Sequence, residues 1–189
     1  MKMPPRLYIA LLHYPVYDRQ GRVVTTAVTN LDIHDISRSS RTYGAERFYI
    51  VTPIEQQKAL VRKILRHWQD GPGALYNPSR GEAFGLAEVR GSLEEVLADI
   101  SEKTGCRARL VVTGARFTAG VIGFEELRRN MASDSGPYLL LFGTGSGLAG
   151  EVTDRADFIL EPLGRSSDYN HLSVRSAVAV VLDRLWRER

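Results

Sequence analysis

Cysteine is nearly absent from this chain, which has Cys106 and no other cysteine among its 189 residues. A single cysteine excludes an internal disulfide framework and a cysteine-rich zinc site, and it is consistent with a reducing compartment. The four histidines show no metal-ligand spacing, so we expect no metal. We expect Cys106 to be a small buried residue near the start of a strand.

Long hydrophobic runs are also absent. No apolar stretch approaches the roughly 18 residues of a membrane span, and the apolar run that follows Arg6 is too short for a secretory signal. We therefore expect a cytoplasmic protein with no membrane segment. An excess of one charge sign is missing too, because the formal net charge is only +3 at pH 7. That balance permits nucleic-acid binding without requiring it.

What the sequence does contain is a regular alternation of strand-like and helix-like segments. This alternation predicts an α/β protein with a largely parallel sheet, helices on both faces and a single domain over residues 1–189. The expected strands are 7–12, 48–51, 87–89, 109–112, 138–142 and 158–160. The expected helices are 33–43, 54–68, 93–104, 124–131 and 172–186.

Local signals refine this outline. Asp32 is expected to cap the first helix and Gly44 to stop it, while Ser92 and Glu95 have the spacing of a capping box. Residues 13–26 indicate a loop or a small hairpin. Residues 69–85 form the longest expected loop, of a length that is often functional or mobile.

Four glycines within eight residues follow the apolar run 138–142. Such a loop lets the main chain approach a ligand closely. Gly145, Gly147 and Gly150 match a dinucleotide fingerprint, but residues 151–157 are too few for the crossover helix that a dinucleotide fold requires. No Gly-Lys-Ser/Thr follows for a P-loop. A nucleoside-type ligand and a ligand-free surface turn both stay open at this point.

Four segments resemble the three motifs of the SPOUT RNA methyltransferases. Residues 32–51 resemble the first motif, 140–148 the second, and 159–163 with 169–177 the third. The bacterial group most similar to this chain is related to an extension of some tRNA (guanine-N1) methyltransferases. The resemblance implies a deep C-terminal trefoil knot, bound S-adenosylmethionine, and a homodimer whose site uses both subunits. It also implies an enzyme that methylates tRNA or rRNA.

The resemblance assigns roles to individual residues. Arg38 matches the catalytic or substrate-orienting arginine of the first motif. The residues that it implies for S-adenosylmethionine are Phe142, Gly143, Thr144, Gly145, Gly147, Leu148, Leu160, Glu161, Pro162, Leu163, Asn170, Leu172 and Ser173. Thr113 and Gly114, at another strand end, are weaker additions. Asp32 stands where the family has an asparagine, and the glycine loop lacks the usual glutamate, so ribose oxygen and base nitrogen both stay open as methyl acceptors.

Other interpretations remain beside this one. A non-catalytic module that binds the cofactor or RNA for a partner methyltransferase is the alternative to an enzyme. His34, Asp35 and His171 are candidate general bases, although neighbours such as His34 and Asp35 point in different directions on a helix. Ser173 is expected to cap the last helix. Basic residues with interleaved aromatics fit either an RNA-binding face or a solvated surface; they are Arg38, Arg41, Arg47, Arg62, Lys63, Arg66, Tyr43 and Trp68.

Overall fold

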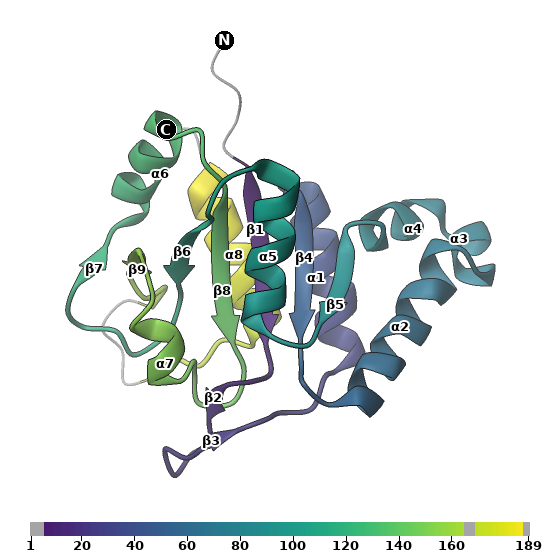
Figure 1. The fold of residues 1–189 in the computed structure, drawn as a ribbon, viewed down its shortest axis with the longest axis horizontal. Helices are drawn as coiled ribbons and strands as arrows, with labels where there is room; N and C mark the ends of the chain where they lie inside the picture. Colours follow the sequence, from purple (N-terminus) through teal and green to yellow (C-terminus); the bar gives the residue numbers. More distant parts are fainter. Residues whose placement is uncertain (1–5, 165–168, 187–189) are drawn as a thin grey trace.

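The computed structural model describes residues 6–164 and 169–186. These residues contain a parallel sheet with strand order β5-β4-β1-β8-β6-β9-β7 (Figure 1). The strands are β1 (Leu7–Leu12), β4 (Arg47–Val51), β5 (Ala87–Arg90), β6 (Arg109–Val112), β7 (Val121–Ile122), β8 (Tyr138–Gly143) and β9 (Phe158–Leu160). A separate antiparallel hairpin joins β2 (Val16–Tyr17) to β3 (Val23–Val24).

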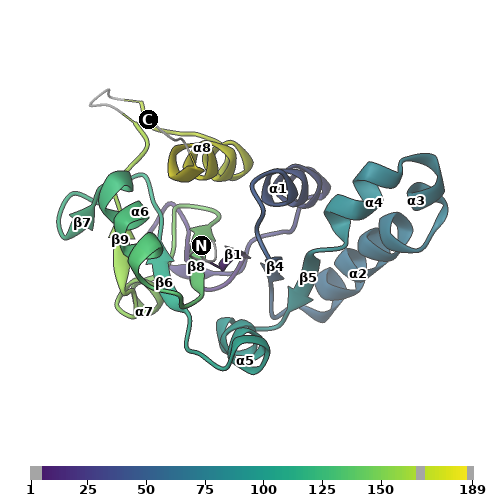
Figure 2. The same cartoon turned by 90° about the horizontal axis from the view of Figure 1, so that it is seen from above.

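Helices cover both faces of the sheet, as the sequence predicts (Figure 2). The helices are α1 (Asn30–Thr42), α2 (Glu55–Gln69), α3 (Pro72–Tyr76), α4 (Pro78–Phe84), α5 (Leu93–Thr104), α6 (Phe124–Ser133), α7 (Gly150–Thr153) and α8 (Val174–Trp186). Alternate residues of β1 enter two different cores. Leu7 and Ile9 pack with α1, α2, α6 and α8, whereas Tyr8 and Ala10 pack with α5 and α7. Because both faces are covered, every residue of β1 is buried and its sequence is continuously apolar.

Helix ends follow mostly from local chemistry. The Ser92 hydroxyl accepts from the Glu95 N–H at 3.2 Å, which confirms Ser92 as the expected cap. The Glu95 carboxylate accepts from the Gly91 N–H at 2.8 Å, one residue before the N–H that a capping box uses. The cap of α1 differs from the prediction. Thr29 is the N-cap and accepts from the Asp32 N–H at 3.2 Å, while Asp32 occupies the third helical position.

The largest error concerns residues 69–85, which fold into α3 and α4 rather than a loop. Pro72 and Pro78 lie in the first turns of these helices, and the Asn77 side chain caps α4 by accepting from Arg80 N–H at 3.1 Å. Helices of five and seven residues are shorter than the roughly 11–18 residues over which helical periodicity is recognised, so the pattern read as a loop.

Smaller differences have similar causes. Cys106 is exposed rather than buried, because Gly105 ends α5 and Cys106 lies in the turn before β6. The two-residue strand β7 and the four-residue helix α7 carry too few residues for a periodic signal. α8 begins at Val174, two residues later than expected, and the Ser173 hydroxyl accepts from the Ser176 N–H at 3.4 Å. Thus Ser173 takes the capping position that we expected.

The expected trefoil knot stays a prediction, because residues 165–168, between β9 and α8, lie outside the described residues. Within the described parts of the chain, no helix combines the length and apolar character needed to cross a bilayer.

Candidate functional site

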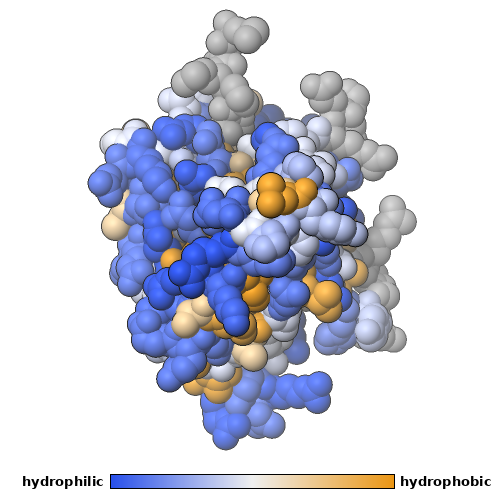
Figure 3. Space-filling view, turned by 90° about the vertical axis from the view of Figure 1, so that its right-hand side faces the viewer, coloured by the Kyte–Doolittle hydropathy of each residue, from blue (hydrophilic) through white to orange (hydrophobic). Residues whose placement is uncertain are grey.

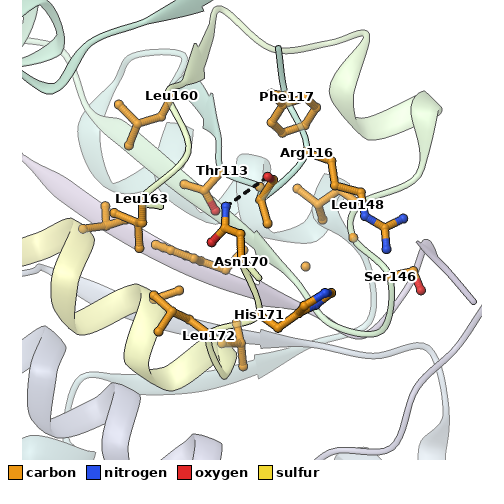
Figure 4. A pocket seen from close by; sticks show the side chains of 18 of the residues that line it. Thr113, Arg116, Phe117, Ser146, Leu148, Leu160, Leu163, Asn170, His171 and Leu172 are labelled. Carbon is orange, nitrogen blue, oxygen red and sulfur yellow. Dashed lines mark hydrogen bonds between the residues drawn. The ribbon is translucent and has the colours of Figure 1, made fainter. Parts of the chain in front are cut away.

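A cavity of about 400 Å³ opens at the carboxyl edge of the sheet. Strands β8, β6 and β9 are neighbours, so the loops that follow them meet at one place (Figure 4). Residues 113–117 follow β6, residues 143–148 follow β8, and residues 160–164 with 170–174 connect β9 to α8. A crevice outside the carboxyl ends of parallel strands is the usual ligand site of open α/β sheets.

The glycine loop after β8 is fixed by close backbone contacts. A Cβ on Gly143 would lie 2.8 Å from the Leu148 nitrogen. Gly145 has φ +61°, and a Cβ there would lie 2.7 Å from the Tyr17 carbonyl oxygen. That oxygen accepts from the Ser146 N–H at 2.7 Å, and the Tyr17 N–H donates to the Gly147 oxygen at 2.9 Å. The β2–β3 hairpin therefore holds the loop in a shape that only glycine at position 145 permits.

A hydrogen-bond network of two hydroxyl groups and one imidazole ring stabilises the same loop. The Thr144 and Thr26 hydroxyl oxygens lie 2.5 Å apart, and Thr144 also donates to the Leu12 carbonyl at 3.1 Å. The His13 Nδ1 lies 3.0 Å from the Thr26 hydroxyl, and its buried Nε2 has no hydrogen-bond partner among the described residues. Burial lowers the pKa of His13 to about 4, so the ring is neutral at pH 7.

The cavity combines apolar walls with a polar side. Phe142, Leu148, Leu160, Leu163 and Leu172 are among its lining residues. Figure 4 shows the side chains of Arg116, His171 and Ser146 on one side of the space. The Asn170 side chain donates to the Ala115 carbonyl at 3.2 Å and so ties the segment before α8 to the loop after β6. Apolar walls beside exposed glycine backbone suit the flat ring of a nucleoside.

Most of the residues expected to hold the cofactor lie at this cavity. The lining includes Phe142, Gly143, Gly145, Gly147, Leu148, Leu160, Glu161, Leu163, Asn170 and Leu172. Thr144, Pro162 and Ser173 are not among the lining residues, since Thr144 braces the loop and Ser173 caps α8. The Glu161 carboxylate accepts from the Phe124 N–H at 3.1 Å, at the start of α6. Its role in binding a ligand stays a prediction, as do the roles of the other residues.

The cavity also has lining residues that the sequence analysis did not assign to it. Arg116 and Phe117 line the cavity together with the weaker candidates Thr113 and Gly114. Their position just after the end of β6 was the signal by which the sequence could have identified them. Tyr17 had no local signal, because its place depends on the hairpin folding back onto the glycine loop. His171, a candidate base, is also a lining residue, whereas the other His/Asp candidates are elsewhere.

The first-motif candidates Asp32, His34, Asp35 and Arg38 lie on α1, outside the cavity lining. Arg38 is exposed there. Asp35 pairs with Arg175 of α8 at 3.3 Å, and the buried Asp32 lies 3.5 Å from the same guanidinium. His34 packs edge-on against Phe84, and burial followed by the positive charge of Arg80 lowers its pKa. His34 and Asp35 thus have different partners, as expected for neighbours on a helix, and a catalytic role for either stays a prediction.

Within the part of the chain that the structure describes, no group of three or more His, Cys, Asp or Glu residues is arranged to hold a metal ion. That the protein works without a metal stays a prediction.

Comparison with known proteins adds a second line of evidence. A family model described as a SAM-dependent RNA methyltransferase matches residues 6–187. A tRNA (guanine-N(1)-)-methyltransferase of Oleidesulfovibrio alaskensis is 49% identical over 179 residues, which are 95% of this chain but only 41% of that protein. An uncharacterized protein of Aquifex aeolicus is 39% identical over 180 residues, which are 95% of this chain and 88% of that protein. The chain thus spans less than half of the first relative and most of the second.

The fold has solved counterparts. The SpoU methyltransferase AviRb of Streptomyces viridochromogenes, solved in complex with AdoMet, superposes with a TM-score of 0.61 at 18% identity. The match covers 98% of this chain and 58% of that one. At this level of identity the similarity shows a common fold.

Proposed function

The chain belongs to the family of SAM-dependent RNA methyltransferases, and we propose that it transfers the methyl group of S-adenosylmethionine to a tRNA. The substrate class is the one named for the Oleidesulfovibrio relative, of which this chain spans 41%. We propose that residues 1–189 act as one catalytic domain. A tRNA substrate implies a cytoplasmic location, in keeping with the single cysteine.

The observation that carries this proposal is the cradle formed by Gly143 and Gly145 beside apolar walls. A side chain at either position would collide with neighbouring atoms, so the loop keeps this shape at the cavity only with glycine there. A volume of about 400 Å³ falls within the range of small-molecule and cofactor sites. The residues present therefore fit a nucleoside cofactor. Leu148, Leu160 and Leu163 would flank the adenine, and the glycine loop would offer main-chain partners.

When bound, S-adenosylmethionine supplies an electrophilic methyl group on a positively charged sulfur. The protein then has to place one RNA atom close to this methyl and accept one proton from that atom. His171 is a lining residue of a type that can accept a proton, and Arg116, on the same side of the cavity, can attract an RNA phosphate. The apolar walls exclude water from the other side of the cavity.

Arg38 needs a second subunit to take part. It lies on α1 outside the cavity lining, so the role implied for it requires the cavity of a partner copy. We therefore propose a homodimer. The exposure of Tyr169 (75%) and Leu172 (51%) near the cavity supports a further surface packing there.

The test is transfer of a labelled methyl group from S-adenosylmethionine to unfractionated bacterial tRNA, followed by nuclease digestion and mass spectrometry of the nucleosides. The Arg38→Ala variant should lose transfer while keeping its affinity for S-adenosylmethionine, and Arg38→Lys serves as a charge-preserving comparison. Transfer by Arg38→Ala at the original rate would contradict the role of Arg38. Cofactor binding without any transfer would instead favour the non-catalytic module.

A further inference from the structure

Three helices form a projection at the β5 edge of the sheet. We call residues 55–84, which comprise α2, α3 and α4, the α2–α4 projection. Figure 2 shows these helices extending outward beyond β5, away from the strands β6 and β9 that border the cavity. Its helices α3 and α4 lie in the residues that read as a long loop in the sequence.

The projection is packed around one aromatic ring. The Arg80 guanidinium lies over the Trp68 ring, 4.7 Å from its centroid, and the His34 ring meets Trp68 edge-on at 5.3 Å. α3 lies directly against this ring, because a Cβ on Gly73 would lie 2.7 Å from the Trp68 Cε3 atom. α3 therefore packs against α2 and α4 in a defined position.

Two large side chains at the end of α3 remain in solvent. Leu75 and Tyr76 are each 88% exposed, and no other large hydrophobic side chain among the described residues is as exposed. An exposed tyrosine on a packed helix offers a flat apolar face to a partner. Binding through it has a small entropic cost, since only two side-chain torsions need ordering. Figure 3, which views the molecule from this side, shows apolar spots within a mainly hydrophilic surface.

The charge of the projection is positive. Residues 55–84 contain five basic and three acidic residues, a net charge of +2 within a chain total of +3. Two of the acids are already paired, Glu55 with Lys58 and Glu82 with Arg41. Arg62, Lys63 and Arg66 are exposed and have no acidic partner within 4.0 Å in the described residues. This excess favours a polyanionic partner.

We propose that the α2–α4 projection is an RNA-docking surface, on which Tyr76 stacks against an unpaired base while Arg62 and Arg66, one turn apart on α2, contact phosphates. Single-stranded RNA is held by this combination of aromatic stacking and backbone charge. The proposal rests on the proposed function, because it names how the substrate of the cavity is anchored. Three strand spacings of about 4.8 Å, roughly 14 Å in all, separate β5 from β8, so an RNA must span at least that distance to reach both the projection and the glycine loop.

The test measures binding of the cofactor-free protein to fluorescently end-labelled tRNA by anisotropy over a series of salt concentrations. Tyr76→Ala should weaken binding about fivefold or more, whereas Tyr76→Phe, which keeps the ring, should bind like the wild type. The double variant Arg62→Ala/Arg66→Ala should reduce the slope of log K against log salt by roughly 1.4–1.8. Arg129→Ala, on α6, is the control for loss of one surface charge elsewhere.

Equal binding by wild type, Tyr76→Ala and the double arginine variant would overturn the docking surface and leave the proposed function intact. A wild-type chain that binds S-adenosylmethionine but no tRNA would overturn the tRNA substrate together with this surface. Sedimentation of the same variants supplies a further check. A change from dimer to monomer in Tyr76→Ala would assign the surface to self-association and overturn the proposal.

Discussion

Replacing Gly145 by alanine isolates the contribution of the glycine loop. Gly145 and Gly21 both have positive φ, +61° and +77°, so alanine at either position incurs the left-handed backbone cost of about 1–2 kcal/mol. They differ in their surroundings. A Cβ on Gly145 would lie 2.7 Å from the Tyr17 oxygen, whereas a Cβ on Gly21 would have no heavy atom within 4 Å. Gly21→Ala is therefore the matched control.

The collision at Gly145 forces the loop away from the hairpin. This movement lengthens the 2.7 Å hydrogen bond from the Ser146 N–H to the Tyr17 oxygen, a further loss of about 0.5–1.5 kcal/mol. Each kcal/mol corresponds to roughly 2–4 °C in Tm for a chain of this size. Because the loop lines the cavity, Gly145→Ala should also lower the affinity for S-adenosylmethionine at least tenfold, a loss of about 1.4 kcal/mol.

Thermal unfolding and calorimetric titration with S-adenosylmethionine measure the two effects on the same samples. Gly21→Ala should lose stability and keep its affinity, whereas Gly145→Ala should lose both. Unchanged affinity in Gly145→Ala would refute the cradle as the basis of binding. An equal loss of affinity in both variants would show that general destabilisation is responsible.

Three further predictions concern the support of the site and the sheet. The pKa of buried His13 is about 4 when folded and 6.5 when unfolded, so the unfolded state binds the proton first as pH falls, and stability should drop by about 2 kcal/mol between pH 7 and pH 5. Urea unfolding should show a smaller drop in His13→Gln; an identical drop would contradict the assignment. Tyr49→Phe removes an O–H that donates to Asp99 at 2.6 Å, so the free energy of unfolding measured with urea at pH 7 should fall by about 1.5–3 kcal/mol. An unchanged free energy of unfolding would contradict this prediction. Asn170→Ala should weaken cofactor affinity severalfold in a titration, because the bond to the Ala115 carbonyl is lost, and full affinity would mean that this tie is dispensable.

The Asp99 carboxylate has a pH dependence of the opposite kind from His13. Burial raises its pKa, but the three donors Lys103, Tyr49 and Arg90 outweigh burial and lower it to about 2. The folded pKa lies below the ordinary value of 3.8, so the carboxylate stabilises the fold above that value and loses this contribution as pH falls towards 2. The change in stability due to Asp99 thus falls at lower pH than the change due to His13.

The sequence predicted the parts of this protein that depend on local patterns. Continuous apolar runs such as residues 7–12 identified strands buried on both faces, and the glycines after β8 identified the main-chain loop of the cavity. Because the ends of neighbouring parallel strands meet, these patterns also placed the loops after β6 and β9 at the same edge. The RNA methyltransferase family that the resemblance implied is confirmed by the family match over residues 6–187.

Features that depend on distant contacts could not be predicted in this way. Tyr17 reaches the cavity because a hairpin folds back over residues more than a hundred positions later. Thr144 belongs to the second motif, but its hydroxyl bonds to the Thr26 hydroxyl and the Leu12 carbonyl. α3 exists because Gly73 allows it to lie on the Trp68 ring, a packing relation that has no periodic signature. Arg38 was assigned by its motif, and its distance from the cavity lining emerged only from the fold.

The most direct test of the central claim is calorimetric titration of the purified chain with S-adenosylmethionine, with NAD as the control ligand, after mass spectrometry has shown that no ligand co-purified. The account predicts one S-adenosylmethionine per chain with a Kd in the micromolar range, and no binding of NAD. A folded, ligand-free protein that binds neither compound, or that binds NAD equally well, would contradict it.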